Sequence, residues 1–185
     1  MGYAIAEELA GQGAEVILVS GPVAITAQDK NIKVVSVESA REMFEACLSV
    51  FPECDGAVMT AAVADFTPAI PEKQKTKRDS SDWSLLLKPT TDIAAALGKR
   101  KKENQLLVGF ALETNNEIEN AQSKITSKNL DLVVLNSLRD KGAGFGAETN
   151  KITLIGKDNK LQAFELKTKK EVAADIVEMM KTLLR

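Results

Sequence analysis

The sequence predicts a three-layer α/β sandwich with a mostly parallel central sheet and a β-hairpin appendage. Short apolar, β-branched runs, which are typical of strands covered on both faces, alternate with stretches whose apolar residues recur at helical spacing. Toward the carboxyl end this alternation stops, and two strand-like runs at 151–156 and 161–166 flank a polar tetrapeptide. The 185 residues, 44% of them hydrophobic, are enough to build the core of a single domain.

Each element has a local signal. The first helix covers 3–10, where Ile5 and Leu9 share a face, and it ends near Gly11 or Gly13. Serine or threonine followed three residues later by glutamate marks two further helix starts, at 39–42 and at 114–117. Strands are predicted at 16–19, 32–37, 56–60, 106–111 and 132–135, and the remaining helices around 93–97 and from 172 to 184.

Composition excludes several classes of protein. The net charge of -2 argues against binding nucleic acid through bulk electrostatics. The chain has no histidine, which removes Ser-His-Asp and Cys-His catalysis and the commonest zinc ligand. Cys47 and Cys54 fit neither a disulfide framework nor a C-x-x-C motif. No apolar run approaches the length of a membrane span, so we expect a cytoplasmic protein without a membrane partner.

Polar and small residues gather where the predicted parallel strands end, at 20–22, 60–65, 110–113 and Asn136. Ligands of such sheets bind at the carboxyl ends of the strands, so these residues are expected to converge. One of these ends carries Asp65, and lysines follow on the loop at 72–75. A carboxylate near ammonium groups suits phosphate chemistry, although a strand end followed by a solvated basic loop is the simpler interpretation of that segment alone.

Seven short motifs, in order along nearly the whole chain, resemble the phosphopantothenate-cysteine ligase (phosphopantothenoylcysteine synthetase) domain of the bacterial coenzyme A biosynthesis bifunctional proteins. They are M-G-x-A-I-A at 1–6, L-V-S-G-P-V at 18–23, A-A-V-A-D at 61–65, most of E-K-x-K-K at 72–75, V-G-F-A-x-E-T at 108–114, K-N-L-D at 128–131, and G-F with Asn150. No single motif is specific, but their order is. The resemblance implies a Rossmann-like fold.

The resemblance also implies a reaction. Such ligases join 4'-phosphopantothenate and L-cysteine through an acyl-cytidylate formed from CTP, with a divalent metal such as Mg²⁺ and no flavin in this domain. A carboxylate is a weak nucleophile and a triphosphate is highly charged, so cations must neutralise the two anions before they approach. Family members form homodimers, and we expect the 151–166 hairpin as the interface. In many bacteria the ligase is fused to a flavin-dependent decarboxylase.

Carried over residue by residue, Lys73 matches the catalytic lysine of a flexible active-site flap, expected at 73–81. The other matched positions are expected to contact the nucleotide. They are Met59, Thr60, Ala61, Asp65, Thr91, Asp92, Ile93, Ala94, Phe110, Lys124 and Lys128, together with Lys73 itself. Lys124 and Lys128 are four residues apart and so project from one side of a helix. The resemblance identifies no protein ligand for the metal.

Two departures from the family pattern stand out. Thr76 replaces the last lysine of the flap motif, and the chain begins at the methionine of the family's S-S-G-K-M-G segment. The family's first strand and a catalytic asparagine are therefore not among these residues, and we expect a truncated ligase domain with impaired turnover. The alternatives are a catalytically incomplete nucleotide-binding module or, less favoured, a nicotinamide-dependent oxidoreductase. The latter needs G-x-G-x-x-G between strand and helix, whereas Gly11 and Gly13 follow a helix.

Overall fold

A computed structural model describes residues 1–72, 74, 75, 77, 82–113, 115–137 and 147–184. The helices are α1 (Gly2–Gly11), α2 (Ala40–Val50), the 3₁₀ turn η1 (Phe51–Glu53), α3 (Ile93–Arg100), α4 (Glu117–Lys128) and α5 (Lys169–Leu183). The strands are β1 (Val16–Ser20), β2 (Ile32–Ser36), β3 (Gly56–Met59), β4 (Phe66–Pro68), β5 (Leu87–Pro89), β6 (Leu106–Glu113), β7 (Leu132–Ser137), β8 (Thr149–Asn150), β9 (Ile152–Gly156), β10 (Leu161–Ala163) and β11 (Lys167–Thr168).

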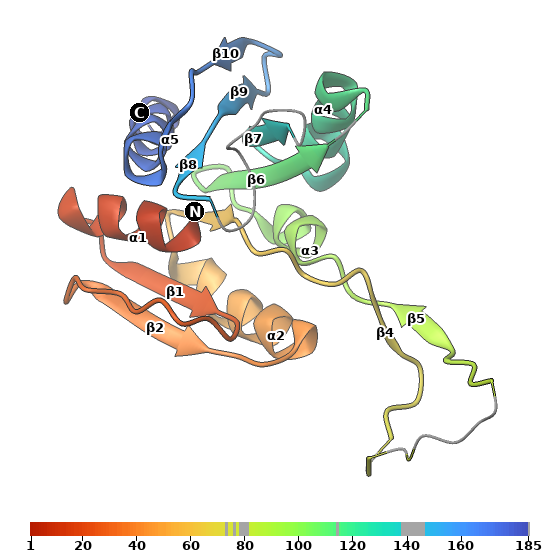
Figure 1. Cartoon of the computed structure of the whole chain (residues 1–185). Coiled ribbons are helices and arrows are strands. Elements are labelled where there is room, and N and C mark those ends of the chain that lie inside the picture. Colours follow the sequence, from red (N-terminus) through yellow and green to blue (C-terminus); the bar gives the residue numbers. More distant parts are fainter. Residues whose placement is uncertain (73, 76, 78–81, 114, 138–146, 185) are drawn as a thin grey trace.

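The predicted α/β fold is confirmed, with a mixed central sheet. Its five strands lie in the order β10-β9-β7-β6-β3, and β3, β6 and β7 are parallel. The predicted hairpin forms and extends this sheet, because β9 pairs antiparallel with β7 and β10 with β9. Strands β1 and β2 form a separate parallel pair, and β4 with β5 forms an antiparallel pair that projects from the body as an arm (Figure 1).

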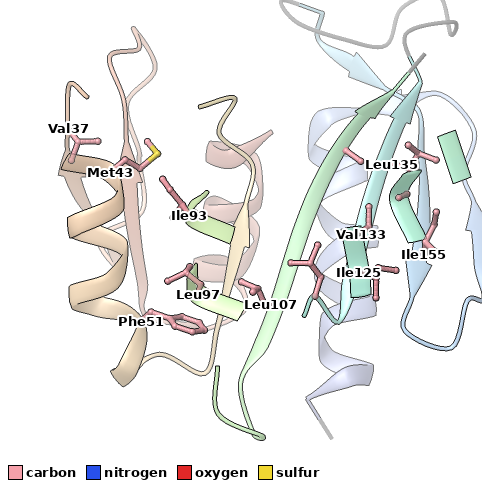
Figure 2. Packing of buried hydrophobic residues seen from close by; sticks show 13 residues of the cluster. Val37, Met43, Phe51, Ile93, Leu97, Leu107, Ile125, Val133, Leu135 and Ile155 are labelled. Carbon is pink, nitrogen blue, oxygen red and sulfur yellow. The ribbon is translucent and has the colours of Figure 1, made fainter. Parts of the chain in front are cut away.

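Helices cover both faces of the central sheet, as alternation along its strands requires. Residues 107 and 111 of β6 contribute to a core with α2, α3 and α4, whereas residues 106 and 108 of the same strand pack with α1 and α5. Successive strand residues point to opposite faces, so one apolar strand supplies two cores. Figure 2 shows the first core, in which Leu107 of β6 lies near Leu97 of α3. Among the described residues, no helix is long and apolar enough to cross a bilayer.

The helix starts follow their capping residues. Ser39 caps α2, since its side chain accepts a hydrogen bond from the Glu42 amide, as predicted. The start predicted at 114–117 differs, because Asn116 in a left-handed conformation precedes α4 and makes no side-chain cap. A capping box that we did not predict opens α5, where Thr168 and Glu171 exchange hydrogen bonds.

Candidate functional site

The carboxyl ends of β3, β6 and β7 meet at one edge of the central sheet. In the strand register Met59 lies beside Gly109, and Asn136 lies beside Leu112. The segment that follows β3 therefore lies next to the end of β6, as the sequence predicted. This edge is where a parallel sheet binds its ligands.

At the end of β6, Glu113 pairs with Lys124 of α4. The Lys124 Nζ lies 2.6 Å from Glu113 Oε1, and the Asn120 side-chain amide donates to Glu113 Oε2 at 3.1 Å. The Lys124 ammonium group, with a smaller contribution from Asn120, holds the pKa of the Glu113 carboxyl below its ordinary value against the opposing effect of partial burial. Both carboxylate oxygens are thus engaged, and Glu113 is ionised at neutral pH.

The start of α3 holds the second lysine. Asp92 caps this helix, because its Oδ1 accepts a hydrogen bond from the Ala95 amide at 3.0 Å, and its Oδ2 lies 2.9 Å from Lys128 Nζ. Burial acts to raise the pKa of Asp92, but the Ala95 amide and Lys128 together hold that pKa below its ordinary value. Each lysine of α4 therefore has its own carboxylate partner, from β6 for Lys124 and from the start of α3 for Lys128.

A close contact between α3 and α4 sets the position of Lys128. A side chain at Gly98 would place its Cβ 1.9 Å from the carbonyl oxygen of Lys128, so only glycine fits there. Asn129 ends α4 in a left-handed conformation, and its side-chain amide donates to the Gly98 carbonyl at 2.9 Å. The K-N pair of the K-N-L-D motif thus joins the end of α4 to α3.

The segment containing Asp65 lies against the segment that leads into α3. The Thr90 amide donates to the Asp65 carbonyl at 2.8 Å, and the Thr90 hydroxyl donates to the Ala64 carbonyl at 2.6 Å. These bonds bring residues 61–65 together with 91–94 at the base of the β4–β5 arm. The side chains of Ala61 and Asp65 are exposed.

Some predicted residues lie elsewhere. Phe110 packs with the α1 and α5 core, on the face of the sheet opposite to Lys124 and Lys128. Thr60 lies against the start of α1, where a Cβ on Gly2 would come within 2.7 Å of its hydroxyl oxygen. The Ile93 side chain is buried, so Ile93 can contact a ligand only through its backbone. Lys73 and most of the predicted 73–81 flap lie outside the described residues.

Within the described residues the structure has two hollows, one beside the carboxyl ends of β1 and β2 and one around β10. A cleft of about 760 Å³ opens beside the carboxyl ends of β1 and β2, and Ser20, Gly21 and Pro22 form part of its wall, with the Tyr3 hydroxyl donating to Ser20 Oγ. A larger hollow of about 930 Å³ lies around β10 and the end of α5, and none of the predicted site residues that the structure describes lines it. The smaller cleft is walled by residues 20–22, which were expected at the site edge, but by none of the predicted nucleotide contacts that the structure describes.

Sequence reasoning placed Glu113 at this edge but did not predict its ion pair with Lys124, and it missed Asn120. Glu113 stands inside the V-G-F-A-x-E-T motif, which is the signal that could have indicated it. Asn120 carries the same signal as Lys124, because it lies one helical turn before that lysine on α4. No group of three or more acidic, cysteine or histidine side chains suited to a metal occurs in the part of the chain that the structure describes.

A family model described as the DNA/pantothenate metabolism flavoprotein C-terminal domain matches residues 1–184. The chain belongs to this family. Within it, a crystal structure of the C-terminal domain of the coenzyme A biosynthesis bifunctional protein CoaBC superimposes with a TM-score of 0.82 at 38% identity, covering 99% of this chain and 81% of that one. The resemblance inferred from the seven motifs is therefore confirmed.

Curated relatives of this C-terminal domain are longer than the chain. A cysteine/cysteine sulfinic acid decarboxylase from an unknown prokaryotic organism is 58% identical over 184 residues, which are 100% of this chain and 51% of that protein. CoaBC of Bacillus subtilis is 43% identical over 183 residues, 99% of this chain and 45% of that protein. The chain spans about half the length of the curated relatives it matches.

Proposed function

We propose that residues 1–185 form a nucleotide-binding ligase domain that joins 4'-phosphopantothenate and L-cysteine, with CTP as co-substrate, in coenzyme A biosynthesis. Membership of the family supports the pathway, because the Bacillus subtilis relative is named a coenzyme A biosynthesis protein. The observation that carries the proposal is the pair of lysines, Lys124 and Lys128, at the carboxyl edge of the sheet. Two ammonium groups on one helix face suit the polyphosphate of a nucleotide.

The reaction has two halves. A carboxylate oxygen of 4'-phosphopantothenate attacks the α-phosphorus of CTP, and the bond from that phosphorus to the bridging oxygen breaks, which releases pyrophosphate. The amine of cysteine then attacks the acyl carbon, CMP leaves, and the amine loses a proton. Lys124 and Lys128 would neutralise phosphate oxygens, and Lys73, the residue matched to the family's catalytic lysine, would stabilise the charge that develops on transfer.

Asp65 is the residue best suited to hold a magnesium ion carried by the nucleotide. Its carboxylate is exposed at the site, whereas those of Asp92 and Glu113 already accept hydrogen bonds and pair with lysines. Mg²⁺ commonly binds through one or two carboxylates plus substrate phosphates, so a single protein ligand fits. When bound, the ion would neutralise phosphate charge.

The same fold could serve other chemistry, and one observation favours a specific alternative. The 58% identical relative is named a decarboxylase of cysteine or cysteine sulfinic acid, a name that belongs to a protein about twice as long. Release of CO₂ from either amino acid by this chain would favour that function. Formation of an amide from 4'-phosphopantothenate and cysteine would favour the ligase.

We also propose a homodimer in which the β4–β5 arm is the main contact. The arm projects from the body (Figure 1) and bears large apolar side chains that are exposed, with Ile70 at 79% and Trp83 at 69%. An isolated two-stranded ribbon is marginally stable in water, so it needs a surface to pack against. The 151–166 hairpin is a smaller candidate interface, because its outer strand β10, which has the open edge, is only three residues long. Sedimentation equilibrium of Ile70→Lys tests the arm, and an unchanged dimer would count against it.

Calorimetry and turnover test the ligase together. We expect CTP with Mg²⁺ to bind more tightly than ATP, and NADH not to bind. In a longer protein that includes the family's first strand, Lys73→Gln should lower turnover by roughly 100-fold, as loss of a key electrostatic contact does, with little change in melting temperature. CTP binding without pyrophosphate release or amide formation would instead favour a catalytically incomplete binding module. A fused flavin-dependent decarboxylase would lie in the half of the longer relatives that this chain does not match.

A further inference from the structure

Both site lysines are held by carboxylates that have a second, fixed partner. Glu113 also accepts from Asn120 at 3.1 Å, and Asp92 also accepts from the Ala95 amide at 3.0 Å. Each carboxylate is therefore anchored independently of its lysine. Lysine has a long flexible stem, and about a third of each side chain is exposed, 34% for Lys124 and 29% for Lys128. The lysines can move while the carboxylates stay in place.

We propose that Glu113 and Asp92 are internal counter-ions, which occupy Lys124 and Lys128 when the site is empty and are displaced from them by a polyphosphate chain. The inference rests on the proposed function, since it deepens the role of the same edge. A polyphosphate carries several charges and competes for both lysines at once, whereas each carboxylate holds only one. The two carboxylates remain near the bound phosphates and repel them, which weakens binding and speeds release of polyphosphate.

A counter-ion role and a structural role predict opposite changes in anion affinity when a carboxylate is removed. If the two ion pairs merely fasten α4 against β6 and α3, removing a carboxylate loosens the lysines and weakens anion binding. If the carboxylates are counter-ions, removing their charge frees the lysines and removes the repulsion, so anion binding tightens. The direction of the change therefore separates the two interpretations.

Two isosteric variants remove the charge and keep the local geometry. Glu113→Gln retains the length of the side chain and an oxygen acceptor, and Asp92→Asn retains a good helix cap. Calorimetry with CTP and with inorganic tripolyphosphate, at low salt and in 0.5 M NaCl, supplies the measurement. We expect each variant to bind both probes about tenfold more tightly at low salt, and the gain to shrink at high salt because salt screens exposed charges.

Glu178→Gln is the matched control, because Glu178 pairs with Lys181 at 2.7 Å on α5, away from this edge. Its affinities should equal those of the wild type. Unchanged or weaker binding of tripolyphosphate by both site variants would overturn the inference even where the wild type binds CTP. The proposed function can fail while the inference holds. In that case the wild type binds tripolyphosphate and the variants bind it more tightly, but CTP binds no more tightly than ATP.

Discussion

The two ends of the central sheet both carry lysine–carboxylate clusters, and the clusters differ in how completely each charge is surrounded. At the amino end, Asp131 receives Lys101, Lys157 and the Leu107 amide, all within 2.8 Å. At the carboxyl end, Lys124 and Lys128 have one carboxylate each. The Lys101 side chain is 6% exposed, against 34% for Lys124.

The difference in exposure distinguishes a lysine with a structural role, Lys101, from one that a ligand can reach, Lys124. Burial lowers the pKa of Lys101, whereas the hydrogen bond to Asp131 raises the pKa of Lys157. Burial opposes ionisation of Asp131, yet hydrogen bonds from both lysines and the Leu107 amide hold its pKa below the ordinary value. The amino-end cluster ties α3, β6, β7 and β9 together around the buried Lys101, although its outer lysine, Lys157, is 48% exposed. Lys101 cannot leave Asp131 without leaving a buried charge unpaired, whereas Lys124 and Lys128 can exchange partners.

The largest effect is expected from Asp131→Ala. It leaves Lys101 buried without its carboxylate, and breaking such a pair typically costs about 4 kcal/mol. Urea unfolding should show this loss, while the CTP affinity of the folded fraction stays at the wild-type value. Asp158→Ala, which removes an exposed pair with Lys160 on the β9–β10 turn, is the control and should change stability little. Equal losses in the two variants would remove the distinction between the clusters.

Gly98→Ala should affect both ends of the sheet. The new Cβ would overlap the Lys128 carbonyl, so α3 and α4 must separate, at a cost of about 3 kcal/mol for an overpacked contact. The separation also displaces the Lys128 backbone and so moves the ammonium group away from the proposed phosphate position, which should lower CTP affinity as well. Thermal unfolding and calorimetry on the same sample check both effects. Gly11→Ala is the control because open space surrounds that position.

Lys124→Met tests the carboxyl end alone. Loss of one charged contact to phosphate should weaken CTP binding by roughly 30-fold, from about 2 kcal/mol per charged hydrogen bond. Unfolding free energy should change by less than about 1 kcal/mol, since the pair is partly exposed. A large loss of stability with unchanged affinity would assign Lys124 to the structural class instead.

A smaller effect is expected on the pH dependence of the unfolding free energy, to which Asp131 of the amino-end cluster contributes. The pKa of Asp131 is lowered in the folded state, so its stabilising contribution is complete above its unfolded pKa of about 4 and is lost as pH falls through the folded pKa. Urea unfolding from pH 7 to pH 3 should therefore lose less free energy in Asp131→Asn than in the wild type. Parallel curves for the two proteins would contradict this role for Asp131.

The sequence predicted what depends on local pattern. The strand 106–111 was visible as an apolar run, and the Ser39 cap as a serine three residues before Glu42. The four-residue spacing of Lys124 and Lys128 placed both on one side of α4. These features need only neighbours in the chain, and they were predicted because periodicity and capping act over one or two turns.

Features that depend on tertiary contact could not be predicted in the same way. The partners of the two lysines come from β6 and from the start of α3, and no local spacing relates them. The β4–β5 arm has strands of three residues each, too short to show a two-residue period. Phe110 stays a predicted nucleotide contact, and the face of β6 that it occupies, beside α1 and α5, depends on the register of the whole sheet.

The measurement that tests the central claim most directly is a calorimetric titration of the Lys124→Met/Lys128→Met double variant and the wild type with CTP and Mg²⁺. The wild type should bind CTP more tightly than ATP, and the double variant should lose at least about 100-fold in CTP affinity, as loss of preorganised electrostatic contacts does, with a nearly unchanged melting temperature. Equal CTP affinity in the two proteins, or no CTP binding by the wild type, would contradict a nucleotide site at the carboxyl edge of the sheet.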